Sequence, residues 1–505
     1  MPTATTPRSA GVLLHPTSLP GPFGIGDLGR EAYFWVDRLA RAKQSWWQIL
    51  PLGPTGFGDS PYSCFSAFAG NPLLVSPERL VEDGLLHQSD IQDVRFPEDR
   101  VDYGPVIAQK SRWLAQAWDN FKGGAGGGLR HGLETFRAAQ ASWLEDYSLF
   151  MAIKQSVGGA DWHKWPDDLR LRSPSALEAA RRSLTDAVRY QQFIQFLFHR
   201  QWQDLKRYAH SQNVRLIGDI PIFVSADSAD VWANPHLFLL DDKRRPKVVA
   251  GVPPDYFMKT GQLWGNPHYD WDVHRKTGFG WWIARVRAML AQVDLIRLDH
   301  FLGFVSAYHI PAKNETAEVG EYVAGPGAAL FEALRAALDG LPFIAEDLGV
   351  VTPEVDALRD RFEMPGMLIL QFAFGGAVEN RFLPHNYIRN AVCYTGTHDN
   401  DTTRGWYRSI SEQERDLLRR YLGREGSDVS WDLIRLAWMS VANQVLTTLQ
   451  DMLNLDSEAR MNFPGHSDNN WSWRFRTEML TDDVVGRLGD LTSLYGREPP
   501  KDEQR

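Results

Sequence analysis

Carboxylate residues stand at the ends of several short apolar segments of this chain. The segments DLIRLD and PFIAE end on Asp299 and Glu346, and the segment AVCYTGT is followed by His398 and Asp399. In a parallel α/β barrel, the carboxyl ends of the strands carry the chemistry. Three carboxylates at three such ends are poorly explained as structural residues. A nucleophile and an acid/base about 5 Å apart are the arrangement of a retaining glycosidase.

The residues around these carboxylates indicate what each could do. Arg297 and Asp299 share one face of a strand. If that face points into a barrel, the guanidinium keeps Asp299 ionised, as a nucleophile requires, although a purely structural ion pair stays open. Burial and the charge of Asp299 are expected to raise the pKa of Glu346, which suits a general acid. His398 and Asp399 have opposite parity, so both reach one site only if the chain bends away from the strand.

Other kinds of site find little support. Gly24–Gly29 (GIGDLG) matches the dinucleotide pattern, but a proline-rich segment separates it from the preceding strand and no acidic residue follows about twenty positions later. A loop at the start of a helix is therefore favoured. The His-Asp neighbours at 299/300 and 398/399 lack a third ligand at a recognisable spacing. We expect no metal and no cofactor.

The elements that must position these residues alternate between apolar strands and amphipathic helices, which favours a (β/α)8 TIM barrel over an open doubly wound sheet. The eight strands we expect are Gly11–His15, Trp46–Pro51, Arg215–Ile220, Asp294–Asp299, Pro342–Glu346, Met367–Phe372, Ala391–Thr397 and Arg460–Phe463. The helices we expect are Asp27–Lys43, Phe193–Gln212, Trp281–Leu290, Gly327–Leu338 and Trp431–Met452.

The spacing of the strands indicates where the barrel carries insertions. More than 160 residues separate the second and third strands, so a helical subdomain is expected over about 76–210. Residues 224–290 are expected to form a loop-rich lid over the active site. Too few residues follow the eighth strand for a C-terminal β-domain, and the final YGREPPKDEQR is expected to be a frayed polar tail. We therefore expect a single catalytic barrel over residues 1–505.

Composition excludes several classes of partner. The chain has 54 Lys+Arg against 63 Asp+Glu, a net charge of −9, which gives no electrostatic footprint for nucleic acid or an anionic membrane. Two cysteines, Cys64 and Cys393, cannot make a disulfide framework, and no apolar leader or spanning segment is present, so a cytoplasmic protein is expected. The oligomeric state and the spatial relation of the two cysteines stay open. Among nineteen tryptophans, Trp264, Trp471 and Trp473 fall in loops where a ring could stack on a sugar.

At these residues the chain resembles the amylomaltases or disproportionating enzymes, the 4-α-glucanotransferases of glycoside hydrolase family 77, which are barrel relatives of the α-amylases. The matching motifs cover nearly the whole chain: HPTSLPGPFGIGDLG, LPLGPTGFGDSPYSCFSAFAGNP, IGDIPIFVSADSADVW, GVPPDYFMKTGQLWGNPHYDW, IRLDHFLGF, IAEDLG, TGTHDNDTT and MNFPGHSDNNWSWR. The resemblance implies a transferase that moves α-1,4-glucan segments between maltooligosaccharides, amylose or starch by a retaining double displacement. Cyclic glucans would form when a chain's own end is the acceptor.

The resemblance also implies roles for single residues. It makes Asp299 the nucleophile, Glu346 the general acid/base and Asp399 the third carboxylate, which stabilises the distorted transition state. It implies a mobile loop over the cleft at Gly251–Trp264. The substrate-binding residues that it implies are Tyr62, Asp219, Trp264, Arg297, His300, His398 and Asn470.

Two positions depart from the family pattern. Leu302 stands where an arginine is common, and Phe57 stands where a tyrosine is frequent. Neither position is one of the three carboxylates, so both bear on product size rather than on the type of reaction.

Two alternatives are less favoured. A hydrolytic α-amylase usually carries Asp-x-x-x-Asn-His after its third strand, whereas this chain has Asp219-Ile-Pro-Ile-Phe-Val. A glucan-binding protein that has lost catalysis would be expected to lack one of the three carboxylates, and all three are present.

Overall fold

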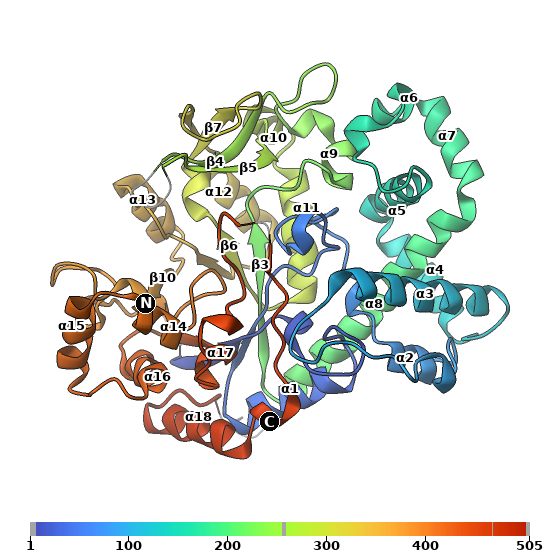
Figure 1. Ribbon diagram of the computed structural model, residues 1–505. Coiled ribbons are helices and arrows are strands. Elements are labelled where there is room, and N and C mark those ends of the chain that lie inside the picture. The colour runs from blue at the N-terminus through green and yellow to red at the C-terminus, as the bar shows by residue number, and fades with distance from the viewer. Residues whose placement is uncertain (1–6, 255–258, 467, 501–505) are drawn as a thin grey trace.

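Eight parallel strands close into a barrel at the centre of the computed structural model, which describes residues 7–254, 259–466 and 468–500 (Figure 1). The strands follow one another around the barrel in the order β1-β12-β11-β10-β9-β6-β3-β2. The predicted (β/α)8 barrel is confirmed. Its strands are β1 (Ser9–Leu13), β2 (Trp46–Gln48), β3 (Arg215–Pro221), β6 (Leu295–Asp299), β9 (Phe343–Ala345), β10 (Gly366–Ile369), β11 (Ala391–Tyr394) and β12 (Gln444–Thr448).

Side chains fill the interior of the barrel. Leu13, Trp46, Ile217 and other apolar residues of the strands form one buried cluster, as expected for a barrel that is a packed core and not a pore. Gly11 makes room for Trp46, because a Cβ atom at position 11 would lie 2.5 Å from the Trp46 carbonyl oxygen. Trp46 is therefore a core residue.

The eighth strand lies elsewhere than predicted. β12 falls inside the predicted helix Trp431–Met452, and the predicted strand Arg460–Phe463 has no regular structure. Helix α16 (Val429–Met439) ends first, the chain turns at Ser440–Asn443, and the strand follows. Every residue of β12 is buried, and for a short, fully buried run periodicity alone does not separate helix from strand. The β-branched residues of QVLTT were the only local sign of a strand.

Helices surround the barrel, and four of the five predicted helices are confirmed, with shifted ends. The long α8 begins well before the residue predicted for it. These barrel helices are α1 (Arg30–Arg41), α8 (Thr185–Ser211), α11 (Gly280–Gln292), α12 (Ala328–Ala337), α13 (Pro353–Arg361), α16 and α18 (Asp482–Leu494). None of the helices in the described ranges combines the length and apolarity needed to cross a membrane.

The interval between β2 and β3 is helical and lies on the right of Figure 1. Lys110 of α3 is buried and its Nζ lies 2.8 Å from Oδ2 of Asp27, whose Oδ1 accepts a hydrogen bond from the nitrogen of Gly29 just before α1. The segment GIGDLG is thus a loop at a helix start that anchors the inserted helices. That these helices form a separate subdomain stays a prediction. They are α2 (Pro77–Glu82), α3 (Tyr103–Lys122), α4 (Leu129–Ala139), α5 (Ala141–Ser156), α6 (Asp167–Arg170), α7 (Pro174–Ser183) and the start of α8.

A small antiparallel sheet lies above the barrel strands in Figure 1, where a loop-rich lid over residues 224–290 was predicted. Its order is β5 (Gln262–Pro267), β4 (Val248–Val252), β7 (Ser306–Pro311) and β8 (Glu321–Ala324). The prediction missed the sheet because β7 and β8, which complete it, follow β6 in the chain. The remaining helices are α9 (Ala229–Ala233), α10 (Trp271–Lys276), α14 (Thr403–Ser409), α15 (Glu412–Leu422) and α17 (Leu449–Met452).

The seam between the first and last strands is held by two arginines. Arg497 is fully buried and donates to the carbonyl oxygens of Trp438 at 2.7 Å, Ser440 at 2.9 Å and Ser9 at 3.3 Å. Arg8 donates to the same Ser440 carbonyl at 2.8 Å. The prediction of a frayed tail is therefore wrong at Arg497, because its buried guanidinium donates hydrogen bonds to carbonyl oxygens near the starts of β1 and β12. Residues 501–505 lie outside the described residues.

Candidate active site

One buried guanidinium joins two carboxylates inside the barrel. Arg297 on β6 lies 2.7 Å from Oδ2 of Asp219 and 2.9 Å from Oδ1 of Asp299. Asp219 lies on β3, in register with Arg297 on the neighbouring strand. Burial opposes the charge of Arg297, but Asp219 and Asp299 outweigh it and raise its pKa well above the ordinary value. A permanent positive charge therefore stands beside Asp299.

Glu346 is a buried carboxyl group directly after β9. Its side chain is 8% exposed, and burial raises its pKa to about 8, with Arg297 opposing and Asp299 adding to the shift. This is the direction expected from the sequence. The nitrogen of His300 donates to Oε2 at 2.6 Å and that of Leu348 to Oε1 at 3.2 Å. At neutral pH the group holds a proton that it can donate.

His300 connects the ends of β6 and β9 through its main chain. It has a left-handed backbone (φ 53°), which a non-glycine residue adopts rarely and histidine more readily than most. This turn directs its N–H to the side chain of Glu346, and the nitrogen of Phe301 donates to the Glu346 carbonyl at 3.0 Å. The backbone that follows Asp299 is therefore bonded to Glu346, so the main chain sets the relative position of the two carboxylates.

His398 and Asp399 reach the site because the chain leaves β11 at Tyr394 and bends. His398 Nε2 lies 3.4 Å from Oδ2 of Asp399, whose side chain is 43% exposed. Burial lowers the pKa of His398, with Asp399 opposing, so the imidazole is neutral at pH 7. The side chain of Asp399 is therefore open to a ligand beside an uncharged ring.

The buried carboxylate of Asp451 supports this loop from below. Its Oδ2 accepts from Oγ1 of Thr395 at 2.6 Å and its Oδ1 from the nitrogen of Thr403 at 2.7 Å. Thr395 and Thr403 lie on either side of His398 and Asp399. The polar residues of TGTHDNDTT are thus partly explained as loop anchors.

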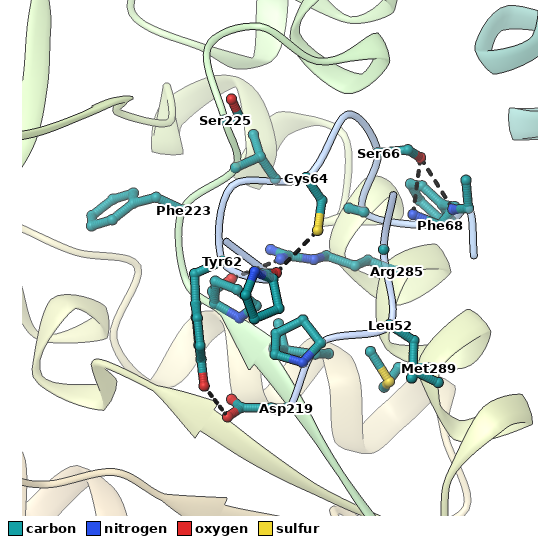
Figure 2. A pocket seen from close by; sticks show the side chains of 18 of the residues that line it. Leu52, Tyr62, Cys64, Ser66, Phe68, Asp219, Phe223, Ser225, Arg285 and Met289 are labelled. Carbon is teal, nitrogen blue, oxygen red and sulfur yellow. Dashed lines mark hydrogen bonds between the residues drawn. The ribbon is translucent and has the colours of Figure 1, made fainter. Parts of the chain in front are cut away.

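Tyr62 joins the loop after β2 to the carboxylate cluster, and Figure 2 shows its side chain reaching from that loop to Asp219. Its hydroxyl donates to Oδ2 of Asp219 at 2.8 Å, and its ring stacks on His398 with centroids 5.2 Å apart. Cys64 on the same loop donates to the carbonyl of Pro61 at 3.0 Å and lines a small cavity behind Tyr62. Cys64 and Cys393 are both free thiols.

Trp264 and Asn470 lie farther from the cluster. Trp264 on β5 is 38% exposed and its ring meets His300 edge-on, with centroids 5.0 Å apart. The amide of Asn470 bonds within its own loop, to the nitrogen of Phe463 and the carbonyl of His466, each at 2.8 Å. Asn470 is therefore not bonded to the carboxylates. Residues 255–258, the middle of the predicted mobile loop, lie outside the described residues.

The remaining sequence interpretations fare unequally. Trp471 and Trp473 were expected at the cleft surface, but they are only 5% and 8% exposed. Trp471 packs on the rings of Tyr62 and His398, and Trp473 belongs to the main hydrophobic core. Phe57 is exposed, whereas Leu302 is half-buried against the core.

Two residues that touch Asp399 were missed. The side-chain amide of Asn462 donates to Oδ1 of Asp399 at 2.6 Å, and Arg460 donates to its carbonyl at 2.7 Å. Both lie in the predicted strand Arg460–Phe463, which does not form. The only available signal was a polar asparagine within the otherwise apolar segment MNFP. In the described part of the chain, no group of three or more His, Cys, Asp or Glu could hold a metal ion.

Comparison with known proteins gives consistent matches. A family model described as 4-alpha-glucanotransferase matches residues 14–481. The 4-alpha-glucanotransferase of Synechocystis sp. is 52% identical over 97% of this chain and 98% of its own length, and that of Thermus thermophilus is 50% identical over 97% and 99%. The solved amylomaltase of Streptococcus agalactiae in complex with acarbose is 38% identical and superposes with a TM-score of 0.94, covering 97% of this chain and all of that one.

Proposed function

The chain belongs to the 4-alpha-glucanotransferase family, glycoside hydrolase family 77, and from this premise we propose how its residues transfer α-1,4-glucan segments between maltooligosaccharides, amylose or starch. The observation that carries the proposal is the pairing of Arg297 with Asp299, next to the buried Glu346. One carboxylate is held beside a fixed positive charge and the other is protonated. These are the states that a nucleophile and a general acid require.

The reaction is a double displacement with retention. Glu346 protonates the glycosidic oxygen while Asp299 attacks the anomeric carbon, which gives a covalent glucosyl-enzyme and releases the rest of the donor. Asp399, open to the cleft, stabilises the oxocarbenium-like transition state. Glu346, now a base, takes a proton from the 4-hydroxyl of an incoming glucan, whose oxygen displaces Asp299 and restores the α-1,4 bond.

The remaining predicted residues hold the sugars in this scheme. The residues assigned to the donor site are Tyr62, Asp219, Arg297, His300 and His398. The contacts that link Tyr62 to Asp219 and His398, and Asp219 to Arg297, support this assignment for four of them. In two further positions, the exposed ring of Trp264 can stack on a pyranose. Asn470, whose amide is bonded within its own loop, is assigned a polar sugar contact from the family resemblance alone.

Transfer requires that a sugar outcompete water at the covalent intermediate. Aromatic rings that hold an acceptor raise its effective concentration, and loops over the cleft exclude solvent. When the acceptor is the far end of the same glucan, the product is cyclic. A cytoplasmic location, inferred from the two unpaired cysteines, remains a further proposal.

Incubation with maltotriose tests the function. Product lengths and total reducing ends are followed together. Disproportionation gives glucose and longer oligomers with a constant number of reducing ends, whereas a steady rise in reducing ends would show a hydrolase.

The nucleophile is tested by Asp299→Asn, which should abolish the reaction in a folded protein. Asp294→Asn is the matched control, because Asp294 has the opposite parity in the same segment and bonds to His210 at 2.9 Å and to the nitrogen of Leu216 at 2.8 Å instead. Substantial activity in the Asp299 variant would contradict the assignment.

A further inference from the structure

The carboxylate of Asp399 has a polar neighbour at each of its oxygens, and one of them makes a hydrogen bond. His398 Nε2 lies 3.4 Å from Oδ2, and the amide of Asn462 donates to Oδ1 at 2.6 Å. Asn462 belongs to a different segment, the loop between α17 and α18, so two separate loops meet at this side chain. The contact with Asn462 is the shorter one and fixes the rotation of the carboxylate about its Cβ–Cγ bond.

Arg460 connects the two loops at the level of the main chain. Its Nη2 donates to the carbonyl of Asp399 at 2.7 Å and its Nε to the carbonyl of Asn462 at 2.8 Å. Its guanidinium lies over the ring of Phe463, 4.3 Å from the centroid. One cation therefore sets the distance between the backbone of Asp399 and the backbone of its amide donor.

This arrangement leaves Asp399 open while it restricts its motion. The side chain is 43% exposed, and an exposed aspartate on a loop would ordinarily rotate freely. A charge that stabilises a transition state acts fully only when it is already oriented, since reorientation during the reaction costs free energy. Hydrogen bonds from outside the site normally supply that orientation.

We propose that Asn462, held in place by Arg460, is a positioning residue that orients the carboxylate of Asp399 for transition-state stabilisation. The inference rests on the proposed role of Asp399 in glucan transfer. Asn462 acts through Asp399, so its loss should lower kcat more than it raises KM.

Two substitutions test the role in opposite ways. Asn462→Ala removes the donor, and kcat/KM on maltotriose should fall about 10- to 100-fold at every pH, as for loss of a hydrogen bond to a charged group. Asn462→Asp keeps the shape but places two carboxylates side by side, where they share one proton. At low pH the shared proton restores a hydrogen bond between residue 462 and Asp399. At higher pH this proton is lost and the two carboxylates repel each other. The optimum of this variant should therefore move to lower pH by about one unit or more.

The surroundings of Asp399 make this readout specific. Among the described residues, ionisable groups that contact or interact electrostatically with it include His398 on its own loop, Arg460 on the loop after α17 and Tyr62 on the loop after β2. Both Asn462 variants leave all three in place. A purely structural Asn462 would lower the melting temperature of its variants and leave the pH profile of the folded fraction unchanged.

Controls separate the possible failures. Asn390→Asp changes an exposed asparagine that donates to the carbonyl of Glu363 at 3.1 Å, before β11, and should keep the profile of the unaltered protein. Asp399→Asn tests the premise. Suppose that Asp399→Asn is inactive. If Asn462→Ala then stays within about twofold of full activity, or if the pH profile of Asn462→Asp is not shifted, the positioning role of Asn462 is refuted and the role of Asp399 stands. If Asp399→Asn is fully active, the proposed role of Asp399 falls and the inference falls with it.

Discussion

Glu346 should destabilise the folded protein above neutral pH, and Glu346→Gln should relieve that cost. Burial raises the pKa of this group from its ordinary value of 4.5 to about 8. Between these values the folded chain holds a proton that the unfolded chain has released. The associated stability is complete below about pH 4.5 and is lost as the pH rises through about 8. Glutamine does not ionise, so its variant escapes this loss.

The size of the effect follows from the two pKa values. The free energy of unfolding changes by about 1.36 kcal/mol per pH unit where the two states differ by one proton. Between pH 6 and pH 9 the unaltered protein therefore loses roughly 2–3 kcal/mol of this free energy, and the variant does not. For a chain of 505 residues the entropy of unfolding is about 1 kcal/mol per degree, so the melting temperatures should diverge by about 2–3 °C.

Differential scanning calorimetry at pH 6 and pH 9 measures this divergence. In the variant, the amide oxygen accepts from the nitrogen of His300, and the NH2 group then faces the nitrogen of Leu348. This juxtaposition of two donors costs the same stability at both pH values. The change with pH in the difference between the two melting temperatures therefore reports only the ionisation of Glu346. Glu379→Gln, at an exposed glutamate, is the control and should show no such change. A difference of the same size at pH 6 and pH 9 would refute the argument that Glu346 is protonated in the folded state.

Three further outcomes are expected. The kcat/KM of the unaltered enzyme on maltotriose should fall about tenfold per pH unit above pH 8, as the general acid loses its proton; a flat profile to pH 10 would contradict this. His300→Gly and His300→Ala both remove the imidazole, but only glycine accepts the positive φ without strain. The glycine variant should therefore melt about 1 °C higher than the alanine variant. Equal melting temperatures would count against a strained turn. Lys110→Met leaves the buried Asp27 without its cation and should lower the melting temperature by about 3–5 °C. The double variant that also carries Asp27→Asn should recover part of that loss. If calorimetry shows no recovery, the loss of the ion pair is not the cause.

The parts of the site that were predictable lie where a polar residue interrupts a buried apolar run. Asp299 and Glu346 are visible in the sequence because a parallel barrel strand is apolar almost to its end, so a carboxylate there stands out. Parity then places Arg297 on the face of Asp299, and the structure shows that ion pair at 2.9 Å.

The parts that were missed depend on contacts between distant segments. β12 reads as helix because a short, fully buried strand that follows a helix has no periodicity of its own, and β4 finds its partner β7 only beyond β6. Asn462 contacts Asp399 across 63 residues, and no local pattern indicates that contact. Trp471 looked like a surface ring because its neighbours in sequence are polar, yet it is buried by Tyr62 and His398 from two other loops.

The seam of the barrel has a consequence for how the protein is made. β1 must pair with β12, and Arg8 bonds to Ser440, 432 residues later in the chain. At 5–20 residues per second, a ribosome needs roughly 20 to 90 s to reach that point after it has made β1. During this interval β2 is the one barrel neighbour of β1 that has been made, and the other edge of β1 stays open. Arg497, which closes the seam, lies 57 residues after Ser440, so the seam is completed only after β12 has been made.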